Sequence, residues 1–324
     1  MKACFQEEYS AVVSKLPATR SESSLCFAVM SDSCLSNELS DTVENMKAVN
    51  EAVSFDCLVH LGNVINGVNP RDISMKLLQG EFAELRSVTE KFYPTIGLKD
   101  GYRDESFCGQ IVPNIMTNEL WYRQIQFLQN DANVTLKKDQ SYYYVDFAEK
   151  KIRLIFLCSF ITQIDEENRL FVKATAIDIE QARWFKNEAL DLPAGWTTVI
   201  FSNTVPKSRF SGESDPFMFR GYSNEMMMSL IQKARKRGVQ TACWIAGGYN
   251  ADAEYELGGI NYVSVSGQLA TRDTTMKYAE ARVATERTLN TKNQDCWDSV
   301  ILDTESRTVR FVRFGSGEDR TITY

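Results

Sequence analysis

Apolar runs of strand length alternate with helical segments in the first third of the chain, and this alternation constrains the fold more than any other feature. We predict strands at residues 24–30 and 57–61 with a helix at 41–53 between them, then a helix at 73–92 and a short strand at 93–96. Strands that alternate with helices form a parallel sheet with helices on its faces. We therefore expect an α/β fold that binds ligands beyond the carboxyl ends of its strands.

The remainder of the chain continues the mixed pattern and ends in antiparallel strands. We predict helices at residues 118–129, 178–190 and 223–238, and strands at 141–147, 152–158, 197–202, 241–246, 262–266, 297–303 and 308–314. The 324 residues contain no internal repeat and no linker rich in proline, glycine or serine. Residues 23–324 are therefore predicted to form a single domain, preceded by an N-terminal extension at residues 1–22.

Five short polar or glycine-containing segments stand where active-site loops would lie, most of them directly after a predicted strand. They cover residues 31–34, 61–63, 97–100, 202–206 and 247–250. The chain has a single histidine, His60, which lies inside a predicted strand rather than in one of these loops. A serine or cysteine nucleophile would have to use this histidine as its base, so its position favours a buried core histidine over a catalytic one.

In their order and spacing, the five loops resemble those of the calcineurin-like metallophosphoesterases, from about residue 25 to the C-terminal end. The loops of that family read D-x-H, G-D, G-N-H-D, H and G-H-x-H. The resemblance implies a four-layer αββα sandwich, in which two mixed β-sheets are flanked by helices. It also implies a site with two divalent metals, where a metal-activated hydroxide attacks a phosphorus ester.

Most of the ligands that the resemblance implies are replaced. Asp32 keeps the family residue, and Asp100 keeps an aspartate that lies outside the metal ligands in the family. Lys99 stands where the family has a histidine acid. The other ligand positions hold Cys34 for a histidine, Asn63 for the bridging aspartate, Leu98 for an asparagine, Asn203 for a histidine, and Gly248 and Asn250 for two histidines. The glycines of the loops remain.

These replacements predict that the dinuclear metal centre is absent and that no cofactor is bound. Two divalent ions about 3.7 Å apart repel each other by roughly 18 kcal/mol at an effective dielectric of 20, and a bridging anion must offset this repulsion. Asn63 is neutral, and neither Leu98 nor Gly248 offers a side-chain lone pair. Cys34 and Asp32 together supply two ligands where a stable site needs about four.

Lys99 suggests a substitute for the metals. Its ammonium could lie between Asp32 and Asp100 and supply positive charge in the former metal cavity. The alternative is a solvated side chain that points outward from the loop. The sequence favours neither arrangement over the other.

The charge and the amino-acid composition argue against some classes of binding partner. A net charge of −7 and a pI near 5.1 argue against a general nucleic-acid binder, which needs a basic face. No apolar stretch approaches the ~20 residues of a membrane span, and no signal peptide is evident. The eight cysteines are scattered without metal-binding spacing, as expected of free thiols in a cytoplasmic protein.

Two functions remain compatible with the sequence. The first is a catalytically inactive protein of the phosphoesterase type that serves as a binding or structural module for an unknown protein or small molecule. The alternative is a divergent phosphoesterase or hydrolase acting on phosphomonoesters or phosphodiesters. It would use one metal, or a metal-free site around Asp32, Lys99 and Asp100.

Overall fold

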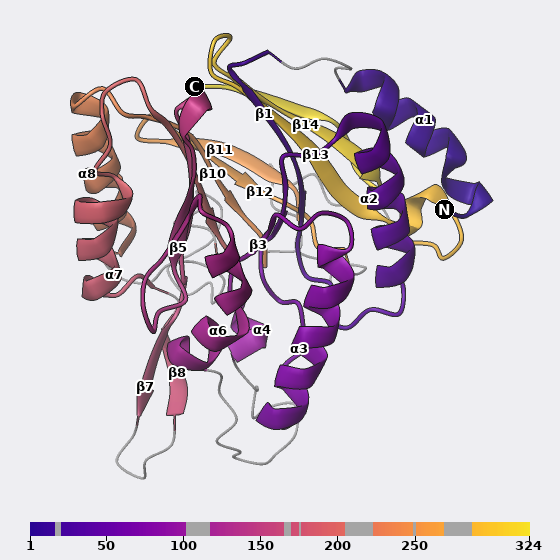
Figure 1. Cartoon of the computed structure of the whole chain (residues 1–324), viewed down its shortest axis with the longest axis horizontal. Coiled ribbons are helices and arrows are strands. Elements are labelled where there is room, and N and C mark those ends of the chain that lie inside the picture. Colours follow the sequence, from indigo (N-terminus) through magenta and orange to yellow (C-terminus); the bar gives the residue numbers. More distant parts are fainter. Residues whose placement is uncertain are drawn as a thin grey trace.

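The computed structural model describes residues 1–16, 21–101, 117–164, 170–174, 176–204, 223–248, 251–268 and 287–324. Two mixed β-sheets pack against each other, and helices cover the outer face of each sheet (Figure 1). The predicted α/β class and the four-layer αββα arrangement are therefore confirmed. Because side chains from both sheets fill the space between them, the main core lies there.

The first sheet joins the N-terminal parallel strands to the C-terminal antiparallel ones. Its strand order is β15-β14-β13-β1-β2-β3, with β1, β2 and β3 parallel and β13 antiparallel to β1. Every residue of β1 is buried, as expected for a central strand covered on both faces. The bounds are β1 (Ser24–Met30), β2 (Cys57–His60), β3 (Phe92–Pro94), β13 (Cys296–Asp303), β14 (Thr308–Gly315) and β15 (Arg320–Thr323).

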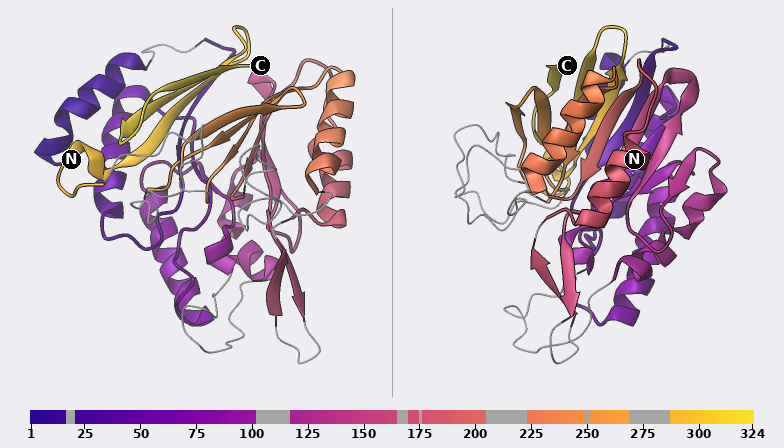
Figure 2. Two further views of the ribbon diagram at one scale, coloured as in Figure 1. Left: turned by 180° about the vertical axis from the view of Figure 1, so that it is seen from behind. Right: turned by 90° about the vertical axis from the view of Figure 1, so that its left-hand side faces the viewer.

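The second sheet has the order β11-β12-β10-β9-β6-β5-β4, and its central strands β12, β10, β9 and β6 are parallel. A separate ribbon of two strands, β7 (Ile161–Ile164) and β8 (Leu170–Ala174), projects away from both sheets (Figures 1 and 2). The bounds of the sheet strands are β4 (Val134–Leu136), β5 (Tyr143–Phe147), β6 (Ile152–Phe156), β9 (Thr197–Ser202), β10 (Gln240–Ala246), β11 (Ala253–Leu257) and β12 (Ile260–Ser264).

Helices form the two outer layers. The first sheet is covered by α1 (Gln6–Lys15), α2 (Leu39–Val53) and α3 (Arg71–Arg86), and the second by α7 (Ile179–Trp184) and α8 (Ser223–Lys236) (Figure 1). The side chain of Asp178 caps α7 by accepting a hydrogen bond from Gln181 N. The shorter helical segments are η1 (Ala3–Phe5), α4 (Leu98–Gly101), α6 (Asn118–Gln124), η2 (Gln126–Asn130), η3 (Ala148–Lys150), the π-helical turn η4 (Phe185–Ala189) and η5 (Lys292–Gln294).

Several predicted boundaries were wrong. The helix expected at 73–92 ends at Arg86, and the strand expected at 93–96 is β3, which begins one residue earlier and ends two residues earlier. The helix expected at 118–129 is split into α6 and η2 at Ile125. Within the N-terminal segment predicted as an extension, α1 packs against α2 and β14, and Phe5, Val12 and Leu16 join the core. The domain boundary at 22/23 stays a prediction.

Four buried charged side chains tie the two sheets together. The Arg313 guanidinium of β14 lies between Asp298 of β13 and Asp252, which precedes β11 in the other sheet; its Nε is 2.9 Å from Asp298 Oδ1, and its Nη2 is 2.8 Å from Asp252 Oδ1. Arg320 of β15 pairs with the same two carboxylates. Burial raises the pKa of Asp252, but the two guanidinium groups outweigh this effect and lower its pKa to about 2. We call these four residues the buried ionic cluster.

The free edge of β3 offers few hydrogen-bond donors. Pro94 has no N–H, its carbonyl accepts a hydrogen bond from Tyr143 Oη at 2.9 Å, and Phe92 N donates to Glu90 O at 3.0 Å. A proline and internally satisfied groups are common means of protecting a sheet edge.

Among the described residues, no helix has the length and apolar character needed to cross a membrane.

Candidate functional site

The predicted loops meet at one end of the two sheets. Loops after β1, β2 and β3 carry Asp32, Asn63 and Lys99, and loops after β9 and β10 bring Asn203 and Gly248 against them. We call these segments the loop cluster. Of the predicted site residues, Asn250 lies outside the described residues, as do Tyr249 and positions 205 and 206 of the fourth loop.

The loop after β1 has an unusual backbone. Asp32, Cys34 and Leu35 all have positive φ angles of 55°, 49° and 60°, and Asn63 in the loop after β2 has φ of 57°. Positive φ is tolerated by aspartate and asparagine but costs energy at cysteine and leucine. Backbone hydrogen bonds hold the strained segment, since Cys34 N donates to Asn63 O at 3.0 Å and Leu35 N donates to Val64 O at 3.1 Å.

Asn63 and Asp32 form the centre of the loop cluster, and both side chains are buried. Asn63 Nδ2 donates to Asp32 Oδ1 at 2.6 Å, while Asn63 Oδ1 accepts from Lys99 N at 2.8 Å. The second bond fixes the orientation of the amide, because a flipped amide would place two donors together. Asp32 Oδ2 accepts from Gly248 N at 2.9 Å and from Ser31 Oγ, so the carboxylate is hydrogen-bonded on both oxygens.

Asp100 joins two loops through backbone groups alone. Its carboxylate accepts hydrogen bonds from Asn63 N and Gly97 N, both at 2.8 Å, and from Ile65 N at 2.9 Å. Burial raises the pKa of Asp100 to about 7, against the opposing effect of these three N–H donors. The side chain therefore serves as an internal acceptor that holds the turn after β3 against the loop after β2.

Asn203 links the second sheet to the first. Its Nδ2 donates to Leu61 O at 2.8 Å, and its Oδ1 accepts from Leu98 N at 3.1 Å. Gly248 packs directly against this amide: a Cβ at position 248, where φ is +67°, would lie 2.9 Å from Asn203 O and 3.0 Å from Asn203 Oδ1. The glycine at this position is thus matched to the asparagine, and any larger side chain would have to displace it.

Lys99 is exposed, in agreement with the solvated arrangement that was one of the two alternatives from the sequence. Its Nζ lies 3.6 Å from Cys34 Sγ, and within the described residues it forms no ion pair with Asp32 or Asp100. Burial and the nearby Asp32 carboxylate raise the pKa of the Cys34 thiol to about 12, although Lys99 opposes the shift. The Cys34 thiol is therefore neutral at pH 7 and a poor nucleophile.

His60 is a buried, fully hydrogen-bonded residue, as its position in a strand predicts. Its Nδ1 accepts from Gly62 N at 3.1 Å, so the proton of the neutral ring lies on Nε2, which is 3.1 Å from Ser33 Oγ. Burial lowers the pKa of His60 to about 3.

Sequence reasoning missed Ser31 and Ser33, although two serines flanking Asp32 directly after a strand were a signal that this loop is hydrogen-bonded internally.

Glycines allow the loops to approach closely. A Cβ at Gly97 would lie 2.0 Å from Asn63 N, and a Cβ at Gly62 would lie 2.5 Å from Gly97 N. These are contacts between backbones, which cannot be relieved by turning a side chain. The loops after β2 and β3 therefore need glycine at both positions.

Gly97→Ala is expected to lower the free energy of unfolding by about 1–3 kcal/mol, as overpacking does. The matched control is Gly80→Ala in α3, where a Cβ meets no atom within 4 Å. That change should raise stability by about 0.5–1 kcal/mol, because alanine favours the helix. Urea denaturation of both variants checks the pair. Equal stability of the two variants would show that the loops move apart at little cost.

The residues of the loop cluster do not fit two divalent metals. Where two cations would need a shared anion, Asn63 presents an N–H donor to Asp32. The Asp32 and Asp100 carboxylates are engaged with protein donors. No group of three or more histidine, cysteine, aspartate or glutamate side chains able to hold a metal ion occurs in the described part of the chain.

Comparisons with known proteins give matches at the level of structure only. No protein-family model matches the sequence, and no curated protein is similar to it. A dimetal phosphatase from Danio rerio has 17% identity and a TM-score of 0.58, with 93% of this chain and 99% of that chain covered. GAP50, described as the anchor in the inner membrane complex of Plasmodium, has 12% identity and a TM-score of 0.52, with 92% and 90% covered. This chain therefore has the calcineurin-like metallophosphoesterase fold.

Proposed function

We propose that this protein is a non-catalytic member of its fold, which serves as a binding or structural module. The observation that carries the proposal is the hydrogen bond of 2.6 Å from Asn63 Nδ2 to Asp32 Oδ1. It places a neutral donor where two-metal chemistry needs a bridging anion, and it uses the one ligand position that keeps its family residue. The hydrogen bonds of the loop cluster then hold the ends of the two sheets together.

The close packing and hydrogen bonding of the loop cluster support a folded binding module rather than an enzyme whose structure has degenerated. Gly62 and Gly97 permit the close approach of two loops, and Asn63 and Asp32 have positive φ angles. The amides of Asn63 and Asn203 each bridge two segments. Such a complete hydrogen-bond network stabilises a single arrangement of the loops, which suits a protein whose surface is recognised by a partner.

A protein or a small molecule is the proposed partner, in the cytoplasm, rather than nucleic acid or a lipid bilayer. The acidic pI near 5.1 disfavours polyanions. The seven cysteines that fall in the described residues are all free, as expected in a reducing compartment. An anchoring role is known for a protein of this fold, since GAP50 is described as an anchor.

The purified protein is expected to contain no stoichiometric transition metal and to hydrolyse phosphomonoesters and phosphodiesters at background rate, with or without added manganese. Elemental analysis and hydrolysis of p-nitrophenyl phosphate and bis-p-nitrophenyl phosphate measure both properties. Asp32→Asn is the matched control, because it removes the one retained ligand without changing its size.

The divergent-enzyme alternative makes the opposite prediction. Turnover well above background that is lost in Asp32→Asn would establish the enzyme and overturn the proposal. Turnover of the same size in wild type and Asp32→Asn would identify a contaminating phosphatase, and the preparation would then be repurified until the two proteins can be compared.

A further inference from the structure

A cavity of about 330 Å³ lies away from the loop cluster, beside the edge strand β3. It is bounded by the end of α3, by β3 and the residues that lead into it, and by η2 and the segment between η2 and β4. Glu90 and Lys91 precede β3, whereas the loop of Lys99 follows it, so the cavity and the loop cluster lie at opposite ends of this strand. Its volume is within the range of small-molecule sites.

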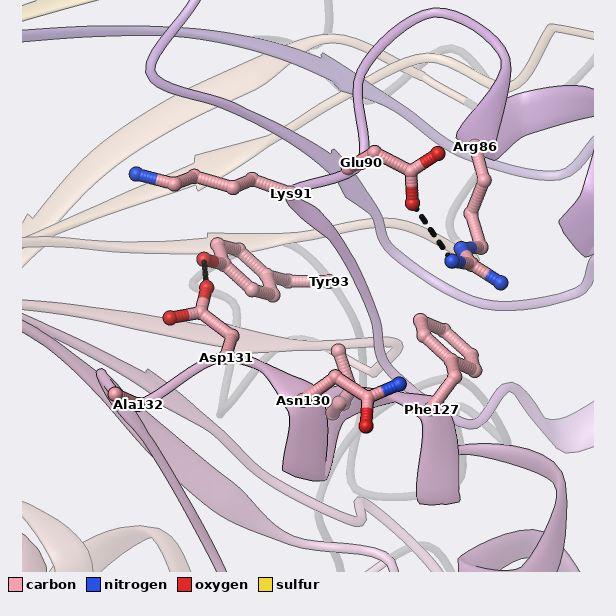
Figure 3. A pocket seen from close by; sticks show the side chains of 9 residues that line it. Arg86, Glu90, Lys91, Tyr93, Phe127, Asn130, Asp131 and Ala132 are labelled. Atoms are coloured by element: carbon pink, nitrogen blue, oxygen red, sulfur yellow. Dashed lines mark hydrogen bonds and ion pairs between the residues drawn. The ribbon is translucent and has the colours of Figure 1, made fainter.

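Some side chains of the cavity wall have partners on neighbouring residues (Figure 3). The ring of Phe127 stacks on Phe92 with an interplanar angle of 5°, and the Arg86 guanidinium lies 4.6 Å from the Phe127 ring centroid. Tyr93 Oη donates to Asp131 Oδ2 at 2.6 Å. The Phe127 and Tyr93 side chains are therefore partly fixed before a ligand binds, which lowers the entropic cost of binding.

The two carboxylates of the cavity already have partners, but two of its donor groups have no hydrogen-bond or ion-pair partner within the described residues. Glu90 forms an ion pair of 2.7 Å with Arg86, and Asp131 accepts from Tyr93 Oη and from Asn133 N. Within the described residues, the Lys91 ammonium has no ion pair. Its Nζ lies 5.8 Å from the centroid of the Phe147 ring. Arg86 Nε is buried without a hydrogen-bond partner. The unused hydrogen-bonding capacity is that of the Lys91 ammonium and of Arg86 Nε.

We propose that this cavity is a binding site for a small organic anion with a planar apolar body, such as an aromatic carboxylate. The apolar body packs against Phe127 and the ring of Tyr93, and the anionic group pairs with Lys91. This site goes beyond the proposed function, since it does not involve the loop cluster.

The test is a titration of the full-length ¹⁵N-labelled protein with sodium benzoate, followed by amide chemical shifts. Saturable shifts are expected at Asn130 and Ala132, with a Kd on the order of millimolar for so small a ligand. Benzyl alcohol and benzylammonium, of similar size but neutral and cationic, should bind at least fivefold more weakly. The absence of saturation, or tighter binding of benzylammonium, would overturn the proposal.

Variants separate the site from non-specific binding. Lys91→Gln should raise the Kd for benzoate at least fivefold, and Ala132→Trp, which fills the cavity from an exposed position, should abolish the saturable shifts. Lys138→Gln removes an exposed lysine that does not line the cavity and should leave the Kd unchanged. Equal binding by wild type and Ala132→Trp would place benzoate elsewhere and refute the assignment. None of these results depends on whether the loop cluster is catalytic.

Discussion

Arg313→Met is expected to lower the free energy of unfolding by about 3–5 kcal/mol, which is typical for removing one partner from a buried ion pair. Arg313 and Arg320 together face two buried carboxylates, Asp252 and Asp298. Without Arg313, one guanidinium would have to compensate two negative charges in the interior. Because Asp298 lies in β13 and Asp252 immediately precedes β11 of the other sheet, the loss should weaken the contact between the sheets and not only β14.

The measurement is urea denaturation followed by circular dichroism, with Arg123→Met as the control. Arg123 forms an ion pair with Glu119 in which both side chains are more than half exposed, so its loss should change stability by no more than about 0.5 kcal/mol. If Arg313→Met does not fold, Arg313→Lys provides the test, since it keeps the charge but loses the two-pronged geometry. Stability of Arg313→Lys equal to wild type would contradict the role given to this cluster.

Acidification from pH 7.5 to pH 5 is expected to lower the free energy of unfolding by about 2 kcal/mol through His60 alone. Burial depresses the pKa of His60 from 6.5 to about 3 in the folded protein, so between these values the unfolded chain binds a proton that the folded chain does not. The contribution is therefore fully present above pH 6.5 and is lost as pH falls toward 3. Between pH 6.5 and pH 3 the whole contribution is the pKa difference multiplied by 1.36 kcal/mol per unit, (6.5 − 3) × 1.36, or about 5 kcal/mol.

His60→Gln separates this effect from the titration of carboxylates. A glutamine amide offers one acceptor and donor groups in place of the Nδ1 acceptor and the Nε2–H donor, but it does not titrate. Urea denaturation of wild type and His60→Gln at half-unit steps from pH 7.5 to pH 5 should show a steeper decline for wild type. Parallel curves would mean that His60 takes up a proton in the folded state as readily as in the unfolded chain.

The sequence predicted the central strands because burial on both faces leaves a continuous apolar run, as in β1 and β10. It did not predict β15, whose first residue, Arg320, is charged and belongs in the interior only because Asp252 and Asp298 meet it there. The edge strand β11 was missed for a related reason. Glu254 and Glu256 break its apolar pattern, and its pairing with β12 depends on tertiary structure.

At the candidate site, the glycines and the order of the strands predicted which loops would meet. The contacts within the loop cluster were not predictable, since they depend on positive φ angles at Asp32, Cys34 and Asn63 that no sequence pattern specifies. Cys34, one of these residues, lies 3.6 Å from the Nζ of the exposed Lys99. The Asn63 amide lies against Asp32. The neutral residue that stands where the family has an aspartate therefore donates a hydrogen bond to Asp32.

The protected edge of β3 limits how another chain can associate with this protein. A strand that tried to extend the first sheet at this edge would find no donor at Pro94 and an internally bonded N–H at Phe92. Self-association by edge-to-edge pairing, a common route to fibrous aggregates, is thereby disfavoured here. A partner that approaches this side must recognise side chains rather than backbone, so its binding should be sensitive to single substitutions on the surface around β3.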